Sequence, residues 1–135
     1  MLYKAECDQG LIDFEYAGYS YGAFDMANMI NENAIDNSEP EWPYWRYVDA
    51  YKLDKEGIAR WVKAYGKGVD FWVEVNIFVC IENVYWALWA LTMVPCWEQG
   101  EFYDHMSYAW MRFDNWKKDL VEIQKLGREG LREAG

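Results

Sequence analysis

The sequence predicts a mainly helical (α+β) fold, in which an N-terminal β-hairpin is followed by four or five helices. Two strand-like runs, residues 2–6 and 11–15, flank Asp8, Gln9 and Gly10, whose composition is typical of a hairpin turn. In the rest of the chain, apolar residues recur at helical spacing. The 135 residues are 53% hydrophobic and 19% aromatic, enough for one domain or part of one with a sizeable core.

The first predicted helix covers residues 24–35. Its apolar residues at helical spacing are Phe24, Ala27, Ile30 and Ala34. Asp25 lies in its first turn, where a carboxylate interacts favourably with the helix dipole. Two prolines within residues 38–43 exclude a continuous helix. Residues 44–51 are expected to form a second, short helix.

The next helix is expected to begin after Asp54, a suitable N-cap, and to end at Gly66 and Gly68. Its expected buried face consists of Ile58, Trp61, Val62 and Tyr65. The Gly66-to-Gly68 step therefore reads as a helix terminus and not as a phosphate-binding loop.

Two long helices complete the prediction. Residues 69–94 form the longest, and Pro95 ends it. Residues 101–126 form the last, and we expect residues 127–135 to fray. The expected buried face of the last helix consists of Met106, Ala109, Phe113, Trp116, Leu120 and Ile123.

Charge and composition limit the partners and the compartment. The chain has 23 acidic and 13 basic residues and a net charge of −10, with no basic stripe, which disfavours nucleic acids and anionic membranes. Polar residues interrupt the apolar segment 69–94, which favours a core helix over a membrane span. Cys7, Cys80 and Cys96 match no zinc spacing and indicate isolated thiols, with Cys80 in the core. We therefore expect a cytoplasmic protein.

Residues 11–33 contain four carboxylates and no Lys or Arg. Asp13 and Glu15 lie two apart on a predicted strand, so both point to one face just before a glycine-containing loop. One or two carboxylates with water and phosphate oxygens are a usual Mg²⁺ site. The alternative is a solvent-facing acidic strand end.

A polar ridge and an aromatic pair follow. Asp25 and Glu32 lie two helical turns apart with Asn28 between them, which indicates either a site or an exposed helix face. Trp86 and Trp89 lie three apart, and with Tyr108 they could enclose a quaternary ammonium group by cation–π attraction. The alternative for these rings is a packed aromatic core. His105, the one histidine, has no acidic residue at a spacing typical of a nucleophilic triad.

Three separated motifs then resemble one family. Residues 11–32, LIDFEYAGYSYGAFDMANMINE, are similar to the signature of choline/ethanolamine kinases, which runs Ile-Asp-Phe/Tyr-Glu-Tyr and later Asp, Asn and Glu. Residues 74–91, EVNIFVCIENVYWALWAL, resemble the family's long helix, and residues 108–113, YAWMRF, resemble its Tyr-Ala-x-x-Arg-Phe motif. The motifs keep the family's order over about residues 1–120.

The resemblance implies the C-terminal lobe of a protein-kinase-like fold and ATP-dependent phosphorylation of choline or ethanolamine, the entry step of phosphatidylcholine and phosphatidylethanolamine synthesis. It implies that Asp13 and Glu15 bind Mg²⁺, with ATP as co-substrate. It also implies that Glu15, Glu32, Trp86, Trp89 and Tyr108 line the amine pocket, with Asp25 and Asn28 as supporting polar residues. Asn37 stands where many choline kinases have a pocket tyrosine, which leaves choline or ethanolamine open.

The family's His-x-Asp catalytic loop has no counterpart here, because His105 lies late in the chain. Residues 1–135 therefore read as a single partial domain, inactive alone, whose partner is the N-terminal portion of the kinase. Homo-association is a further expectation, since a missing lobe exposes apolar surface. The alternatives are a non-catalytic amine-binding module and a structural helical domain.

Overall fold

The computed structural model of the chain describes residues 16–96 and 103–133, with side chains as far as residue 95 in the first range and 125 in the second. The predicted hairpin at residues 2–6 and 11–15 lies outside these residues. The described part holds four α-helices and one short strand pair, so the mainly helical fold class is confirmed. Such an arrangement is that expected of the C-terminal lobe of a kinase-like fold.

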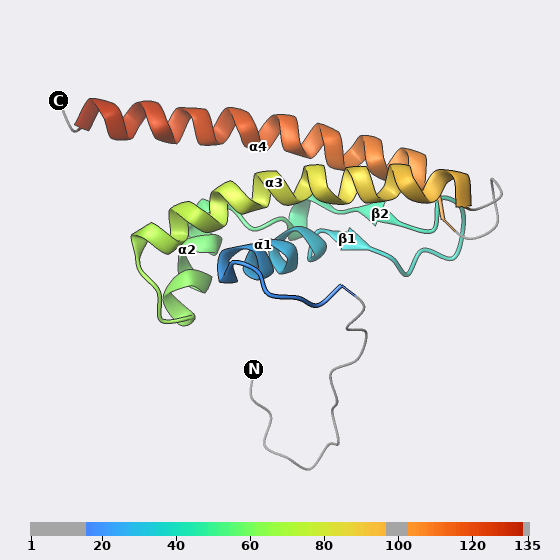
Figure 1. Ribbon diagram of the computed structural model, residues 1–135, viewed down its shortest axis with the longest axis horizontal. Helices are drawn as coiled ribbons and strands as arrows, with labels where there is room; N and C mark the ends of the chain where they lie inside the picture. The colour runs from blue at the N-terminus through green and yellow to red at the C-terminus, as the bar shows by residue number, and fades with distance from the viewer. Residues whose placement is uncertain (1–15, 97–102, 134–135) are drawn as a thin grey trace, which may run out of the picture.

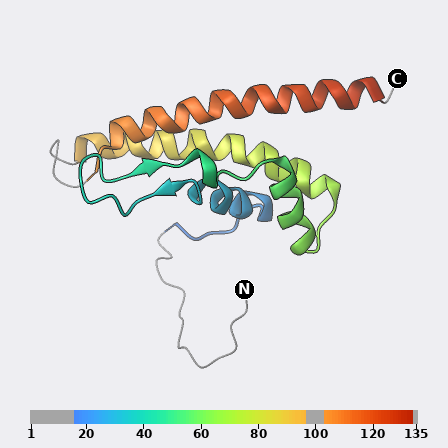
Figure 2. The ribbon, with the colours of Figure 1, turned by 180° about the vertical axis from the view of Figure 1, so that it is seen from behind.

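The elements are α1 (Gly22–Glu32), β1 (Ile35–Asp36), β2 (Arg46–Tyr47), the 3-10 turn η1 (Asp49–Tyr51), α2 (Lys55–Ala64), α3 (Val69–Met93), the 3-10 turn η2 (Val94–Cys96) and α4 (His105–Glu133). Helices α3 and α4 lie side by side along the molecule, and α1 and α2 lie on the other side of α3 (Figures 1 and 2). Helix α3 is therefore the central layer, with neighbours on two sides.

Helix α1 is shorter at its C-terminal end than predicted. Its buried side chains, at helical spacing, are Ala23, Met26, Ala27, Ile30 and Asn31. Ile35 was expected in the helix but pairs with Tyr47 in the antiparallel β1–β2 ladder. The helix ends with its C-cap, Asn33, whose backbone N–H donates to the Met29 carbonyl. Ile35 and Asp36 then belong to the strand pair.

The predicted short helix at residues 44–51 is wrong. Tyr44 adopts φ 65°, a left-handed conformation that a right-handed helix cannot include. Arg46 and Tyr47 then form β2, and only residues 49–51 turn helically, as η1. The break predicted at residues 38–43 is confirmed, since no helix or strand forms there.

Helix α2 begins and ends as predicted. The Asp54 carboxylate accepts a hydrogen bond from the Gly57 backbone nitrogen at 2.6 Å, which makes Asp54 the N-cap. Gly66 has φ 76°, the left-handed conformation that often follows a helix C-terminus. Ile58 and Val62 are buried as expected, but Trp61 and Tyr65 are exposed.

Helix α3 matches the prediction to within one residue, and Pro95 lies just beyond its end in η2. By length and composition alone it is the one described helix that could cross a membrane, a property that core helices of soluble proteins share. Its buried residues include the polar Glu82 and Asn83 as well as Val75, Val79 and Cys80. Cys80 is a free, buried thiol, as predicted.

Helix α4 differs most from its prediction. It is helical to Glu133, beyond the predicted end at residue 126. Its buried residues are His105, Tyr108, Ala109, Arg112 and Asn115, whereas Met106 and Phe113 are exposed. The helix is turned so that Arg112 faces Asn83 of α3, because buried polar groups are stable where they bond each other. Met106, Trp110 and Phe113 instead line an apolar groove of about 250 Å³ with Val84, Ala87, Leu88, Leu91 and Ala109.

Candidate functional site

Three aromatic side chains meet where α3 passes the segment before α1. The ring centroids of Trp86 and Trp89 lie 5.4 Å apart with an interplanar angle of 78°. Tyr16 contacts the edge of Trp86 at 5.9 Å, and its hydroxyl accepts a hydrogen bond from the Trp89 indole nitrogen at 3.0 Å. The structure thus brings both predicted tryptophans together and adds Tyr16, a residue not singled out as pocket-lining from the sequence.

The Trp86 indole N–H is shared between two helices. It donates to Oδ1 of Asn28 on α1 and to Oε1 of Glu82 on α3, both at 2.9 Å. Oε2 of Glu82 accepts from Nδ2 of Asn31 at 2.6 Å. Asn28, predicted as a supporting residue, therefore helps to fix the indole plane, and Glu82 and Asn31 join it from inside the core.

Two open cavities border this cluster. Trp86 lines one of about 710 Å³, together with residues 16–22 and Tyr85. Glu32 lines a second of about 660 Å³, which extends to α2. Asp25 and Asn28 line both cavities, because they lie on the face of α1 between them. The predicted polar ridge thus faces open space next to an indole ring.

Glu32 does not stand alone as an anionic ligand. Its carboxylate forms an ion pair with Arg112 of α4, whose side chain is only 1% exposed while that of Glu32 is 36% exposed. Arg112 also donates to the Tyr108 hydroxyl, from Nε at 2.9 Å and from Nη2 at 2.7 Å. Tyr108 is therefore a buried partner of Arg112, and burial raises its pKa to about 12.

The ion pair continues into a polar chain between the helices. Arg112 donates to Oδ1 of Asn83 at 3.2 Å, and Nδ2 of Asn83 donates to Asp119 at 3.0 Å. Asp119 also pairs with Lys52 at 2.7 Å. This chain links α1, α3, α4 and the segment before α2. The YAWMRF motif is the one sequence feature that points to Arg112. Helical periodicity alone would predict a solvent-exposed arginine at this position.

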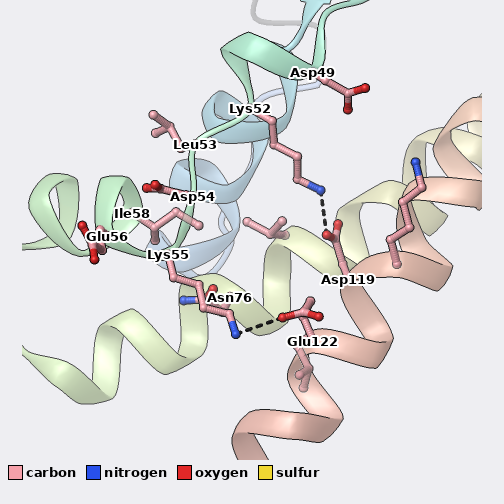
Figure 3. A pocket seen from close by; sticks show the side chains of 13 residues that line it. Asp49, Lys52, Leu53, Asp54, Lys55, Glu56, Ile58, Asn76, Asp119 and Glu122 are labelled. Atoms are coloured by element: carbon pink, nitrogen blue, oxygen red, sulfur yellow. Dashed lines mark hydrogen bonds and ion pairs between the residues drawn. The ribbon is translucent and has the colours of Figure 1, made fainter.

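The end of this chain borders a separate pocket of about 600 Å³ between α2, α3 and α4 (Figure 3). Lys52 and Lys55 point toward α4 there, and they pair with Asp119 and Glu122. None of the predicted site residues lines it. These two ion pairs join α4 to α2 and to the segment before it, which is typical of a structural contact between elements.

Glu82 has the most perturbed carboxyl group of the site. It is 0% exposed, and burial raises its pKa to about 7. The hydrogen bonds from Asn31 and Trp86 and the charge of Arg112 lower the pKa, and the charge of Glu32 raises it. In the sequence, Glu82 is one of the polar residues that interrupt the apolar segment 69–94. Nothing in the sequence indicates that its side chain is buried.

His105 lies at the start of α4 and is buried between rings. Its ring centroid is 5.6 Å from that of Trp89 and 5.0 Å from that of Tyr103. Burial lowers its pKa, which favours a neutral, packed imidazole. His105 is thus packed against two aromatic rings.

The predicted metal ligands Asp13 and Glu15 lie outside the described residues. Within residues 16–96 and 103–133, no three or more His, Cys, Asp or Glu side chains gather closely enough to hold a metal ion. The Mg²⁺ site therefore stays a prediction that concerns residues 11–15.

Comparison with known proteins shows the family of this chain. The sequence profile of the choline/ethanolamine kinase family matches residues 1–117. The chain belongs to this family. The match includes residues 11–32, 74–91 and 108–113, and it covers the positions of Tyr16, Trp86 and Arg112.

Individual kinases of the family support the match. Ethanolamine kinase 1 of Homo sapiens is 33% identical over 130 residues, which cover 88% of this chain and 28% of that protein. Ethanolamine kinase 2 of Rattus norvegicus is 32% identical over 127 residues, 85% of this chain and 30% of that protein. Choline kinase alpha of Mus musculus is 27% identical over 122 residues, 77% of this chain and 26% of that protein. The chain thus spans less than a third of the length of these relatives.

Proposed function

We propose that this chain forms the amine-binding and metal-binding side of an enzyme that transfers the γ-phosphoryl group of ATP to ethanolamine or choline. The observation that carries the proposal is the Tyr16, Trp86 and Trp89 cluster, which borders a cavity lined by Asp25 and Asn28, in a chain of this kinase family.

The substrate ammonium group fits the chemistry of this cavity. A cation against the face of an indole gains roughly 0.5–2 kcal/mol, and Asp25 supplies a carboxylate to the same cavity. Glu32 is paired on one side with Arg112, yet its side chain is 36% exposed toward the neighbouring cavity. A primary ammonium could also donate to Asn28, whereas a quaternary one could not, so the two amines would use different contacts.

Asp13 and Glu15 are proposed to hold Mg²⁺ with the phosphates of ATP. The ion would neutralise charge that develops on the phosphoryl group during transfer. The catalytic base and most of the nucleotide site would come from sequence outside these 135 residues, which agrees with the partial coverage of the relatives. We propose that the enzyme acts in the cytoplasm and catalyses the first step of phosphatidylcholine and phosphatidylethanolamine synthesis.

Calorimetry with choline and with ethanolamine tests the amine site on the purified chain. We expect binding that the double variant Trp86→Ala/Trp89→Ala loses and that the control Trp110→Ala, a change in the exposed α3–α4 groove, retains. Absence of binding at millimolar concentrations of both amines would count against the proposal. So would equal binding by the double variant.

A kinase assay tests whether the chain needs the N-terminal portion of the kinase for activity. The isolated chain should show no phosphorylation of either amine with ATP and Mg²⁺, and joining it to the N-terminal portion of a family member should restore activity. Turnover by the isolated chain near that of a full-length kinase would show that no further segment is needed.

Sedimentation velocity at the same concentrations tests self-association, which the exposed apolar groove favours.

A further inference from the structure

We propose that Glu82, buried behind Trp86, sets the cation affinity of the aromatic site as a positioning residue and counter-charge that does not itself touch the amine. The inference rests on the proposed function, because it assigns a control element to the same amine site. It concerns a residue that neither the motifs nor the spacing singled out.

The contacts of Glu82 make it a clamp on the indole. Its Oε1 accepts from Trp86 and its Oε2 accepts from Asn31, so both oxygens of a fully buried carboxyl group are used as acceptors. Asn31 is itself fixed, because its Nδ2 also donates to the Val79 carbonyl at 3.0 Å. The Trp86 ring is therefore held by a rigid chain that runs through α1 and α3.

Ionised Glu82 strengthens cation binding in two ways. It places a negative charge behind the ring, in an interior where charges interact more strongly than in water. As the acceptor of the indole N–H, it also polarises the ring toward a more negative face, which is the property that attracts cations. Both effects act on a cation in the cavity that Trp86 lines.

Protonation of Glu82 would remove both effects and loosen the clamp. Both oxygens accept from donors here, and a protonated carboxyl group is a weaker acceptor that also carries an O–H donor, so the hydrogen bonds from Trp86 and Asn31 weaken on protonation. The charged groups that face Glu82 are Arg112 from α4 and Glu32 from α1, which pair with each other. The ionisation of Glu82 therefore changes the net charge of the site. Because its pKa is about 7, that change falls near neutral pH.

Two measurements on the full chain test the inference. The indole ¹H–¹⁵N signal of Trp86, assigned with Trp86→Phe, reports the hydrogen bond directly as pH changes. Tetramethylammonium, whose charge does not depend on pH, serves as the cation probe in titrations at about pH 6 and about pH 8. Glu82→Gln removes the titrating group, and Glu74→Gln, an exposed change on the same helix, is the matched control.

We expect the Trp86 signal to titrate with a midpoint near 7 in the unmodified chain and in Glu74→Gln, but not in Glu82→Gln. Tetramethylammonium affinity should rise roughly fivefold between the two pH values in the first two proteins and stay constant in Glu82→Gln. Binding without pH dependence in the unmodified chain, a measurement that needs no variant to fold, would overturn the inference alone. No binding at either pH would overturn the proposed amine site with it.

Discussion

Arg112 on α4 and Glu32 on α1 form an ion pair that joins the two helices on either side of α3. Arg112 is almost fully buried, and it also bonds Tyr108 and Asn83. A buried guanidinium needs such partners, because an unpaired charge in the interior is very unfavourable. The pair therefore fixes how α1, which carries the polar side of the site, sits against the helical pair.

Replacing Arg112 by Met should lower the free energy of unfolding by about 3 kcal/mol, the lower part of the range for breaking a buried pair, since Glu32 can still reach solvent. Urea unfolding followed by circular dichroism measures the change. Lys117→Met, which removes the exposed pair between Lys117 and Asp114, is the control and should leave stability unchanged. Equal stability of the two variants would mean that the buried network adds nothing.

The stability of the chain should depend on pH through Glu82. Its pKa is raised from 4.5 to about 7 on folding, so the folded state holds a proton that the unfolded state releases. The contribution of Glu82 is therefore fully present below pH 4.5 and is lost as pH rises through 7. That loss amounts to roughly 3 kcal/mol relative to Glu82→Gln, which does not titrate. Urea unfolding of both proteins across this range measures it. A constant difference between them would show that Glu82 has an ordinary pKa.

The core between α1 and α3 should be sensitive to lost volume. Ile30 on α1 is fully buried in a cluster that includes Val75 and Val79 of α3. Ile30→Ala should lower the free energy of unfolding by about 3 kcal/mol, from lost burial and the cavity left behind. Ile77→Ala, on the exposed side of α3, should have a much smaller effect. Thermal and urea unfolding compare them, and similar losses would place the core elsewhere.

The sequence allowed the helices to be predicted better than the way they face. The caps and breakers around α2 and α3 are local features, so Asp54, Gly66 and Pro95 marked the element ends correctly. Two-residue strands such as β1 and β2 are too short to show a periodicity, which is why the sequence of residues 44–51 does not reveal β2. The rotation of α4 depends on Arg112 meeting Asn83, a contact between segments far apart in the chain.

Some residues of the candidate site could be predicted from the sequence and others could not. Trp86, Trp89, Asn28 and Glu32 could be named because their residue types and motif spacings are local information. Glu82 and Asn31 could not, because a buried carboxyl group is favourable only when partners from another helix bond it. Tyr108 illustrates the remaining ambiguity: its position in a motif indicates the pocket, yet its hydroxyl bonds Arg112 in the interior.

The turn after α2 should require a residue that tolerates a left-handed backbone. Gly66 has φ 76°, and a side chain added there would meet no atom within 4 Å, so any effect of substitution comes from the backbone alone. Gly66→Ala should lower the free energy of unfolding by about 1 kcal/mol, because a Cβ disfavours this conformation. Gly66→Asn should lower it less, since asparagine adopts the left-handed region more readily. Urea unfolding ranks the three proteins, and an alanine variant as stable as glycine would show that the turn does not hold this conformation in solution.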